Sequence, residues 1–487
     1  MLRCAVMAFV LALFQQAASY DVVLQGGRVM DPETGLDAVR SVGISGGRIA
    51  AVSEQPLRGS TVLDAAGLVV TAGFVDLHSH GQDPENYRLK ALDGVTTALE
   101  LEIGVDDVGK FLQERRGRSA VNYGATASHP FARVRAFGGQ PTPGAIVPAT
   151  GPATETPASA EQLARLAALV RKGLDDGGLG IGMGIAYTPG ATRSEIIETF
   201  RLAAERRLPV FTHVRSTGRI EPGSSVEAMS EVIAAAAITG ASLHIVHMNS
   251  SGARDAPECL RMVEGARARG LDVTTEAYPY IAGMTAVNSA IFNPGWREKL
   301  GVDYKDLQLV ETGERLTRES FERLHASPEP KLVVIFSNTE EMVETVIRHP
   351  LVMIASDGHI EKGKGHPRGA GTYARILARY VRERQQLTLM DALRKMSLMP
   401  AQRLERATAA ARRKGRLQVG ADADVVVFDA RTVVDRSTYS SPAEPSFGFR
   451  HVLVAGTPVV RDGKSADGVF PGRPVVSDQS LAISVSR

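Results

Sequence analysis

Residues 74–80, FVDLHSH, decide the fold of this chain, because two histidines stand at the end of a short apolar run. Alternate side chains of a β-strand share a face, so His78 and His80 point the same way, just before Gly81. Two imidazoles in this arrangement are a ready pair of ligands for a divalent metal ion. We therefore predict a strand that ends in a metal site.

Later apolar runs end in metal-type ligands in the same way. His213 ends LPVFTH, His247 ends ASLHIVH and Asp357 ends LVMIASD, while Glu100 and Glu102 end VTTALELE. In parallel α/β barrels the active site is built at the carboxyl ends of the strands. The shared position of these side chains predicts that they meet in one site.

Helical patterns alternate with these runs between residues 71 and 414. They cover 159–175, with Ser159 as N-cap, and 193–207, 225–239 and 254–269, and a further apolar run, KLVVIF, covers 331–336. Strands that alternate with helices predict βαβ units and a parallel sheet. The length of the segment favours a distorted (β/α)8 TIM barrel over an open sheet.

Both ends of the chain carry short β-signals punctuated by glycine pairs. We expect residues 20–70 and 415–480 to pair into one small β-sandwich domain beside the barrel. The stretch PTPGAIVPATGPATETPA, residues 141–158, is rich in proline and threonine and is predicted to be a loop or a lid.

Composition excludes several classes of protein. The 487 residues carry 56 Lys and Arg against 54 Asp and Glu, and this balance argues against a nucleic-acid-binding protein. The two cysteines, Cys4 and Cys259, exclude a disulfide scaffold and a cysteine-based zinc cluster.

Residues 1–19 read as a secretory signal peptide. Arg3 precedes an apolar run over 4–14, and small residues at 17–19 suit cleavage. The alternative is an uncleaved N-terminal helix. We expect a secreted or periplasmic protein with no membrane span after cleavage.

The chain resembles the amidohydrolase superfamily, and within it the N-acyl-D-amino-acid deacylase (D-aminoacylase) group. The resemblance covers nearly all of the chain after residue 19. It rests on the stretches GFVDLHSH, DGVTT, GIGMGIAYTPG, FTHVRSTG, IVHMNSSG, EAYPYIAG, GHPRGAGTYARIL and GADADVVVFD.

The resemblance implies a zinc site with one or two divalent ions. His78 and His80 would hold the more exposed ion, and His213 and His247 the other. The related group has a cysteine after the GVTT strand, where this chain has none; Glu102 is the nearest equivalent by offset and Glu100 is the alternative. The implied ligand set is His78, His80, Glu102, His213, His247 and Asp357.

The resemblance also implies catalytic roles. Zinc lowers the pKa of water to about 7, which supplies hydroxide at neutral pH. Asp357 would act as general base and then as general acid for the leaving nitrogen. Tyr187 would stabilise the oxyanion, unless it is an ordinary loop-anchoring tyrosine.

Arg368 matches an arginine that binds the substrate α-carboxylate in the related group, and Tyr280 matches a tyrosine that assists it, unless Tyr280 only packs in its turn. Asn249 stands where the group has a lysine, so the clamp on the carboxylate is altered. Arg297, beside Trp296, is either a contact for a second carboxylate, as in a D-glutamate derivative, or a solvated surface residue.

Three further residues are candidates for supporting roles. Asp76 shares a strand face with His78 and would orient an imidazole. His129 is a candidate for the layer behind the ligands, and His244, on the opposite face from His247, belongs to the core or to that layer.

These observations predict a metal-dependent enzyme that hydrolyses the amide of N-acyl-D-amino acids, N-acyl-D-glutamate among them, through a metal-activated hydroxide. The alternatives are a dipeptidase, a cyclic-amide hydrolase of the dihydroorotase or hydantoinase type, and a non-catalytic scaffold of the same fold. The expected partner is a small-molecule amide, and homo-oligomerisation is left open.

Overall fold

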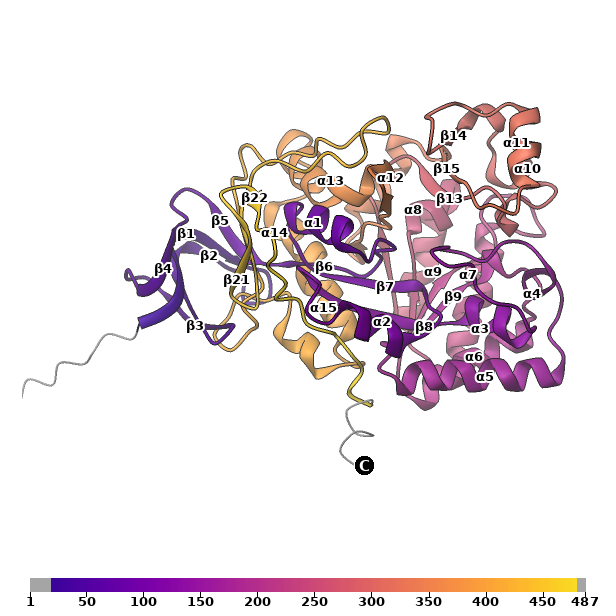
Figure 1. Ribbon diagram of the computed structural model, residues 1–487, viewed down its shortest axis with the longest axis horizontal. Coiled ribbons are helices and arrows are strands. Elements are labelled where there is room, and N and C mark those ends of the chain that lie inside the picture. The colour runs from indigo at the N-terminus through magenta and orange to yellow at the C-terminus, as the bar shows by residue number, and fades with distance from the viewer. Residues whose placement is uncertain (1–18, 480–487) are drawn as a thin grey trace, which may run out of the picture.

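The computed structural model describes residues 19–479. Nearly all of the predicted signal peptide, residues 1–18, lies outside the described residues, as does Cys4. The described chain forms a barrel of alternating strands and helices, with a β-rich sheet at one side (Figure 1). This arrangement confirms the predicted fold class. Among residues 19–479, no helix is long and apolar enough to cross a membrane.

Eight parallel strands form the barrel, and neighbours in the sheet follow chain order. The two terminal strands approach each other through an isolated parallel bridge between Ser79 and Gly358 and through the Asp357 N–H, which donates to the His78 carbonyl at 2.7 Å. The barrel is thus nearly closed. Its strands are β6 (Phe74–Asp76), β7 (Val95–Val105), β8 (Asn122–Ser128), β9 (Ile181–Gly184), β10 (Val210–His213), β11 (Leu243–Ile245), β12 (Val273–Ala277) and β16 (Val352–Ile354).

The helices around the barrel begin at polar caps that the sequence provides. Ser159 accepts a hydrogen bond from the Gln162 N–H at the start of α5, as predicted, and Thr192 and Ser224 cap α6 and α7 in the same way. The surrounding helices are α1 (Pro84–Leu92), α2 (Val108–Arg115), α3 (His129–Ala136), α5 (Ala160–Asp175), α6 (Arg193–Glu205), α7 (Ser225–Thr239), α9 (Ala256–Ala268), α12 (Glu340–Arg348), α13 (Arg368–Arg375) and α15 (Met399–Leu404).

One predicted run, KLVVIF, lies outside the barrel. Its strand β15 (Leu332–Ile335) pairs antiparallel with β13 (Gly283–Ala286) and β14 (Leu307–Leu309) in a three-stranded sheet. This sheet belongs to an insertion between β12 and β16, which also holds α10 (Trp296–Leu300) and α11 (Arg318–His325) and has its own apolar core. The strand that takes its place in the barrel is β8, which lies between β7 and β9. Its side chains are mostly small, so its sequence does not form an apolar run.

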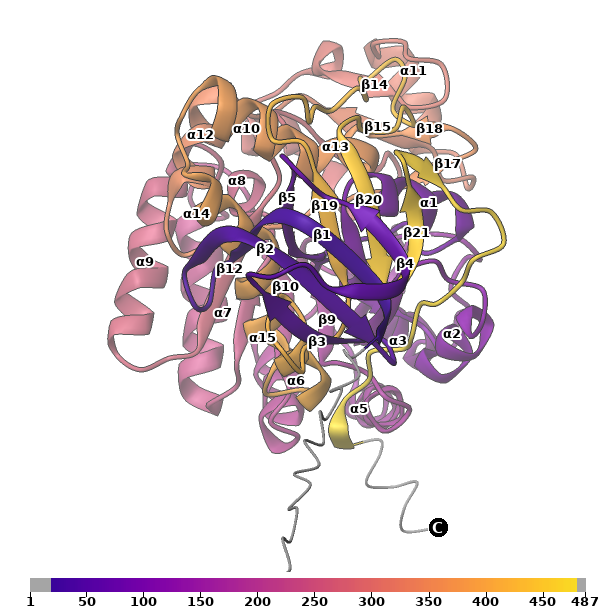
Figure 2. The same ribbon diagram turned by 90° about the vertical axis from the view of Figure 1, so that its left-hand side faces the viewer.

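The two ends of the chain build one nine-stranded sheet. β5 (Val69–Ala72) pairs with β19 (Val425–Phe428), which joins the N-terminal strands to the C-terminal ones (Figure 2). Asp424 ties this sheet to the barrel, because its Oδ2 accepts from Asn122 and from Lys414, each at 2.8 Å. The other strands are β1 (Ser19–Asp31), β2 (Leu36–Ser45), β3 (Arg48–Ser53), β4 (Arg58–Asp64), β20 (Phe449–Val454), β21 (Thr457–Arg461) and β22 (Lys464–Ser465).

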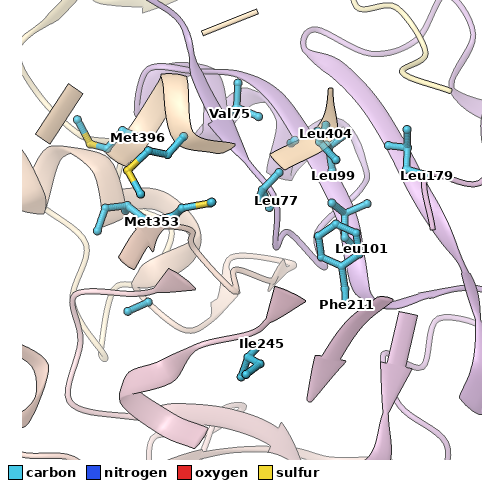
Figure 3. Packing of buried hydrophobic residues seen from close by; sticks show 14 of the residues in the cluster. Val75, Leu77, Leu99, Leu101, Leu179, Phe211, Ile245, Met353, Met396 and Leu404 are labelled. Atoms are coloured by element: carbon cyan, nitrogen blue, oxygen red, sulfur yellow. The ribbon is translucent and has the colours of Figure 1, made fainter. Parts of the chain in front are cut away.

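A continuous apolar core fixes the strands that carry the predicted ligands (Figure 3). Along β7, Leu99 and Leu101 belong to this core, and they alternate with Glu100 and Glu102. Because alternate residues of a strand face opposite ways, packing of the two leucines directs both carboxylates to the other face. The hydrophobic pattern of β7 therefore positions two charged groups.

Candidate active site

Four predicted ligands from three strand ends converge on one point. His78 Nε2 lies 3.2 Å from His80 Nε2, 3.0 Å from Glu102 Oε2 and 3.4 Å from Asp357 Oδ1. His80 Nε2 lies 3.1 Å from Glu102 Oε2 and 3.2 Å from Asp357 Oδ1. Ligands about 2.0–2.2 Å from one ion in a tetrahedral site are separated by roughly 3.4 Å, so this spacing fits a bound cation.

Glu102 joins this group to a second one. Its other oxygen, Oε1, lies 2.7 Å from His213 Nδ1 and 2.9 Å from His247 Nε2, and the two imidazole nitrogens are 3.1 Å apart. The structure therefore brings all six predicted ligands together in two groups that share Glu102. Glu102, rather than Glu100, occupies the shared position.

Hydrogen bonds behind the ligands hold the imidazole rings in orientation. Glu276, at the end of β12, lies 2.9 Å from His78 Nδ1 and accepts from the His247 N–H at 2.9 Å. Glu100 lies 2.7 Å from His80 Nδ1, and Ser251 lies 3.1 Å from His247 Nδ1. Such partners fix the tautomer and raise the basicity of a ligating imidazole.

Glu276 is a functional residue that the sequence analysis did not select. It ends the run LDVTTE, so the criterion that selected the other strand-end carboxylates also applied to it. Its side chain is almost fully buried at 1% exposure, and a carboxylate is buried to this degree almost only when it has partners.

Two ligands sit on unusual backbone. His247 has φ of 33° and Asp357 has φ of 52°, in the left-handed region that residues with a Cβ seldom adopt. Each follows a short strand, and the turn aims its side chain at the same point. Strained conformations of this kind are concentrated at functional sites.

The electrostatics of the site favour ionised carboxylates. Burial acts to raise the pKa of Glu102, but His78, His213 and His247 beside it hold that pKa well below its usual value. Burial acts to lower the pKa of His78, but Asp357 and Glu102 raise it well above its usual value. The ionised carboxylates thus concentrate negative charge at the centre, which favours a bound cation.

A narrow cavity opens in front of the ligands. Tyr187 borders it, with its ring centroid 5.0 Å from that of His213, and its phenolic oxygen accepts from Thr285 Oγ at 3.2 Å, so its proton is free to be donated. Burial raises the pKa of Tyr187 well above its usual value, which keeps it protonated. The outer walls are apolar and include Ile146 and Val147, from the predicted lid segment, and Met284, Ile291, Leu332 and Ile335.

Arg368 lies behind Asp357. Its Nη2 is 2.8 Å from Asp357 Oδ1, and its guanidinium carbon lies 4.5 Å above the ring of Tyr278, which lines the cavity. The Nε and Nη1 atoms of Arg368 have no hydrogen-bond partner among the described residues. They are available donors next to the ligands.

Three residues predicted to contact substrate lie elsewhere. Tyr280 packs against His366, with 5.4 Å between ring centroids, and is not among the residues that line the cavity; Tyr278 occupies that place. Asn249 is fully buried, is not among the residues that line the cavity, and has no hydrogen-bond partner for either amide atom among the described residues. Arg297 pairs with Asp303 at 2.9 Å and is 44% exposed.

Of the three residues expected to support the ligands, Asp76 and His129 have other partners, whereas His244 lies in the core as expected. Among the described residues, Asp76 has no hydrogen bond to an imidazole nitrogen; it binds the Lys90 ammonium at 2.8 Å and accepts from the Ser356 N–H at 3.0 Å, which joins the two terminal strands of the barrel. His129 lies 2.9 Å from Glu195, in a buried network away from the ligands. His244 lies in the core, 2.8 Å from Thr274 Oγ.

Comparisons with known proteins agree with this geometry. The Amidohydrolase family model matches residues 69–459. The chain belongs to the amidohydrolase family. It is 30% identical to the N-acyl-D-glutamate deacylase of Alcaligenes xylosoxydans xylosoxydans, over 95% of this chain and 98% of that protein. It is 28% identical to the D-aminoacylase of the same organism, over 93% and 97% of the two chains.

A solved structure shares the whole architecture. The N-acyl-D-glutamate deacylase of Bordetella bronchiseptica, complexed with zinc and a phosphonate inhibitor that mimics the tetrahedral intermediate, superposes with a TM-score of 0.78 at 25% identity. The alignment covers 94% of this chain and all of that one. The two proteins therefore share their overall fold over nearly the whole of both chains.

Proposed function

We propose that this member of the amidohydrolase family hydrolyses N-acyl-D-amino acids to a carboxylate and a free D-amino acid. The observation that carries the proposal is the pair of ligand groups joined by Glu102 at the floor of a cavity. The similarity to N-acyl-D-glutamate deacylase and D-aminoacylase over nearly the whole chain supports the substrate class.

The donor set fits one or two zinc ions. Imidazole nitrogen and carboxylate oxygen are the ligands that zinc takes in catalytic sites, and every ligand here is one or the other. The two oxygens of Glu102 face different groups, as a carboxylate must if it is to serve two ions. When bound, zinc polarises the scissile carbonyl and makes water a better nucleophile at neutral pH.

Residues of the chain supply the proton transfers. The Asp357 carboxylate accepts a proton from the attacking water and returns it to the amide nitrogen as the C–N bond breaks. The Tyr187 hydroxyl donates a hydrogen bond to the oxygen that gains negative charge in the transition state. Both side chains border the cavity.

Arg368 is the candidate to hold the substrate α-carboxylate: it lies directly behind Asp357, although it is 1% exposed and, like Tyr280, is not among the residues that line the cavity. Its Nε and Nη1, which have no hydrogen-bond partner among the described residues, lie on different edges of the guanidinium, so each can donate a single hydrogen bond to a substrate carboxylate. Tyr278, on which Arg368 is stacked, supplies the neighbouring wall.

The proposal is tested with paired enantiomers. Zinc-loaded protein is given N-acetyl-D- and N-acetyl-L-forms of leucine, methionine and glutamate, and release of free amine is measured. We expect turnover of D-forms and a fall in kcat of about 10²–10⁴-fold for Asp357→Asn, the range that general acid–base catalysis contributes. Full activity of Asp357→Asn, or turnover of dipeptides or cyclic amides alone, would contradict the proposal.

We also propose that residues 1–19 are removed during export and that the enzyme acts in the periplasm or outside the cell. The support is the order of Arg3, the apolar run and the small residues before the predicted cleavage point. N-terminal sequencing of protein from the periplasmic fraction should begin at Tyr20. Recovery of the activity in the cytoplasm, with Met1 retained, would contradict this localisation.

A further inference from the structure

A second cavity, of about 300 Å³, lies at the opposite end of the barrel from the ligands. It is bordered by Asp272 and Leu351, each of which stands one residue before a barrel strand, and by side chains of α15. We call it the basal cavity. Its polar lining consists of Arg267, Asp272, Thr274, Arg394, Arg403 and Arg406, together with Gln402.

The charges that line the basal cavity do not balance. Four arginines face one carboxylate, Asp272, whose two oxygens already accept from Arg403 at 3.0 Å and from Arg406 at 3.2 Å. Ser242 Oγ also donates to Asp272, at 2.7 Å. Both carboxylate oxygens of Asp272 are therefore occupied, and the arginines that line the cavity carry more positive charge than this one carboxylate neutralises.

Among the described residues, the hydrogen-bond partners of the other two guanidinium groups are backbone carbonyls. Arg267 donates to the Val273 carbonyl at 2.8 Å, and Arg394 donates to the Pro350 carbonyl at 3.4 Å. Backbone carbonyls satisfy a hydrogen bond but carry no net charge. Two positive charges at the edge of the basal cavity therefore have no ionic partner in its lining.

Arg403 is buried and has unsatisfied hydrogen-bond donors. Its side chain is 3% exposed, and its Nε and Nη2 atoms have no hydrogen-bond partner among the described residues. Buried donors of a charged group are almost always satisfied, and leaving them unpaired is unfavourable. Arg403 is thus held in place by Asp272, with part of its donor fork unused.

We propose that the basal cavity binds a compact oxyanion of the phosphate type. Arginine forks match the oxygens of phosphate in paired hydrogen bonds, and Arg394, Arg403 and Arg406, from one short stretch of the chain, all line the cavity. Thr274, in its wall, lies on β12 two residues before Glu276, so a bound anion would rest against the strand that orients His78.

Titration of the zinc-loaded full chain with inorganic phosphate, followed by calorimetry at constant ionic strength, tests the proposal. The variant Arg394→Gln/Arg406→Gln removes two charges near the surface and leaves the buried Arg403 in place. The control Arg171→Gln/Arg201→Gln removes two exposed arginines from α5 and α6. We expect phosphate affinity to fall at least tenfold in the first variant and to stay within twofold in the control.

Phosphate that bound only at the candidate zinc site would bind equally to the wild type and to both variants. That result, or no phosphate binding by the wild type, would overturn the proposal. Arg403→Lys keeps the charge but removes the fork, and we expect it to weaken phosphate binding as well. If Arg403→Lys proves unstable, the surface pair still decides the question.

Discussion

At the scale of single residues, Glu102 determines what kind of centre this is. The resemblance leads one to expect a cysteine after this strand, but here a carboxylate places one oxygen in each ligand group. A carboxylate is a harder ligand than a thiolate, so we expect the centre to accept hard divalent ions more readily than a thiolate-bridged one would.

Glu276 allows a test of the layer behind the ligands. Glu276→Gln keeps the size of the side chain but removes the charge that orients His78 and accepts from His247. We expect zinc affinity to fall about 10–100-fold, as it does when such partners of a ligand are lost. Competition with a chromogenic chelator measures it.

The matched control is Glu264→Gln, which removes an exposed carboxylate whose ion-pair partner among the described residues is His349. Its zinc affinity should equal that of the wild type. Equal affinities in both variants would show that Glu276 does not orient the ligands.

At the scale of secondary-structure elements, the ligands could be predicted because each one ends an apolar run, and strand-end positions meet in a parallel barrel. Glu276 satisfied the same criterion but was not selected.

The positions of Tyr278 and Tyr280 depend on how the chain turns after β12, which the local sequence pattern does not specify. KLVVIF was assigned to the barrel because its composition cannot distinguish a barrel strand from a strand of the insertion.

The contact between α1 and α13 predicts a pH effect. Asp93, at the end of α1, is buried and accepts from the N–H groups of Tyr373 and Ala374, and burial raises its pKa to about 7. Folding raises this pKa from its usual value of 3.8. The stability that the protonated carboxyl provides is therefore fully present below about pH 3.8 and is lost as the pH rises through about 7.

We therefore expect the free energy of unfolding to contain a component that falls between pH 5 and pH 7. The variant Asp93→Asn should reduce this fall by at least about 1 kcal/mol, since one pKa unit corresponds to about 1.36 kcal/mol. Urea unfolding at a series of pH values measures it. Identical pH dependence in variant and wild type would show that Asp93 is ionised throughout this range.

At the scale of the whole molecule, the centre draws its ligands from strands distributed around the barrel, so metal binding should stabilise the entire fold. A ligand that binds only the native state adds about 2.7 kcal/mol at one hundred times its Kd. We expect zinc to raise the Tm of chelator-treated protein by several degrees and magnesium to raise it less. An unchanged Tm on zinc addition would contradict assembly of the ligands into one site.

The most direct test of the central claim is the rate of amine release from N-acetyl-D-leucine and N-acetyl-L-leucine as zinc is titrated into chelator-treated protein. The account predicts negligible activity without metal, a rise with zinc up to one or two ions per chain, and strong preference for the D-form. Undiminished activity in the metal-free protein, or equal rates for the two enantiomers, would contradict it.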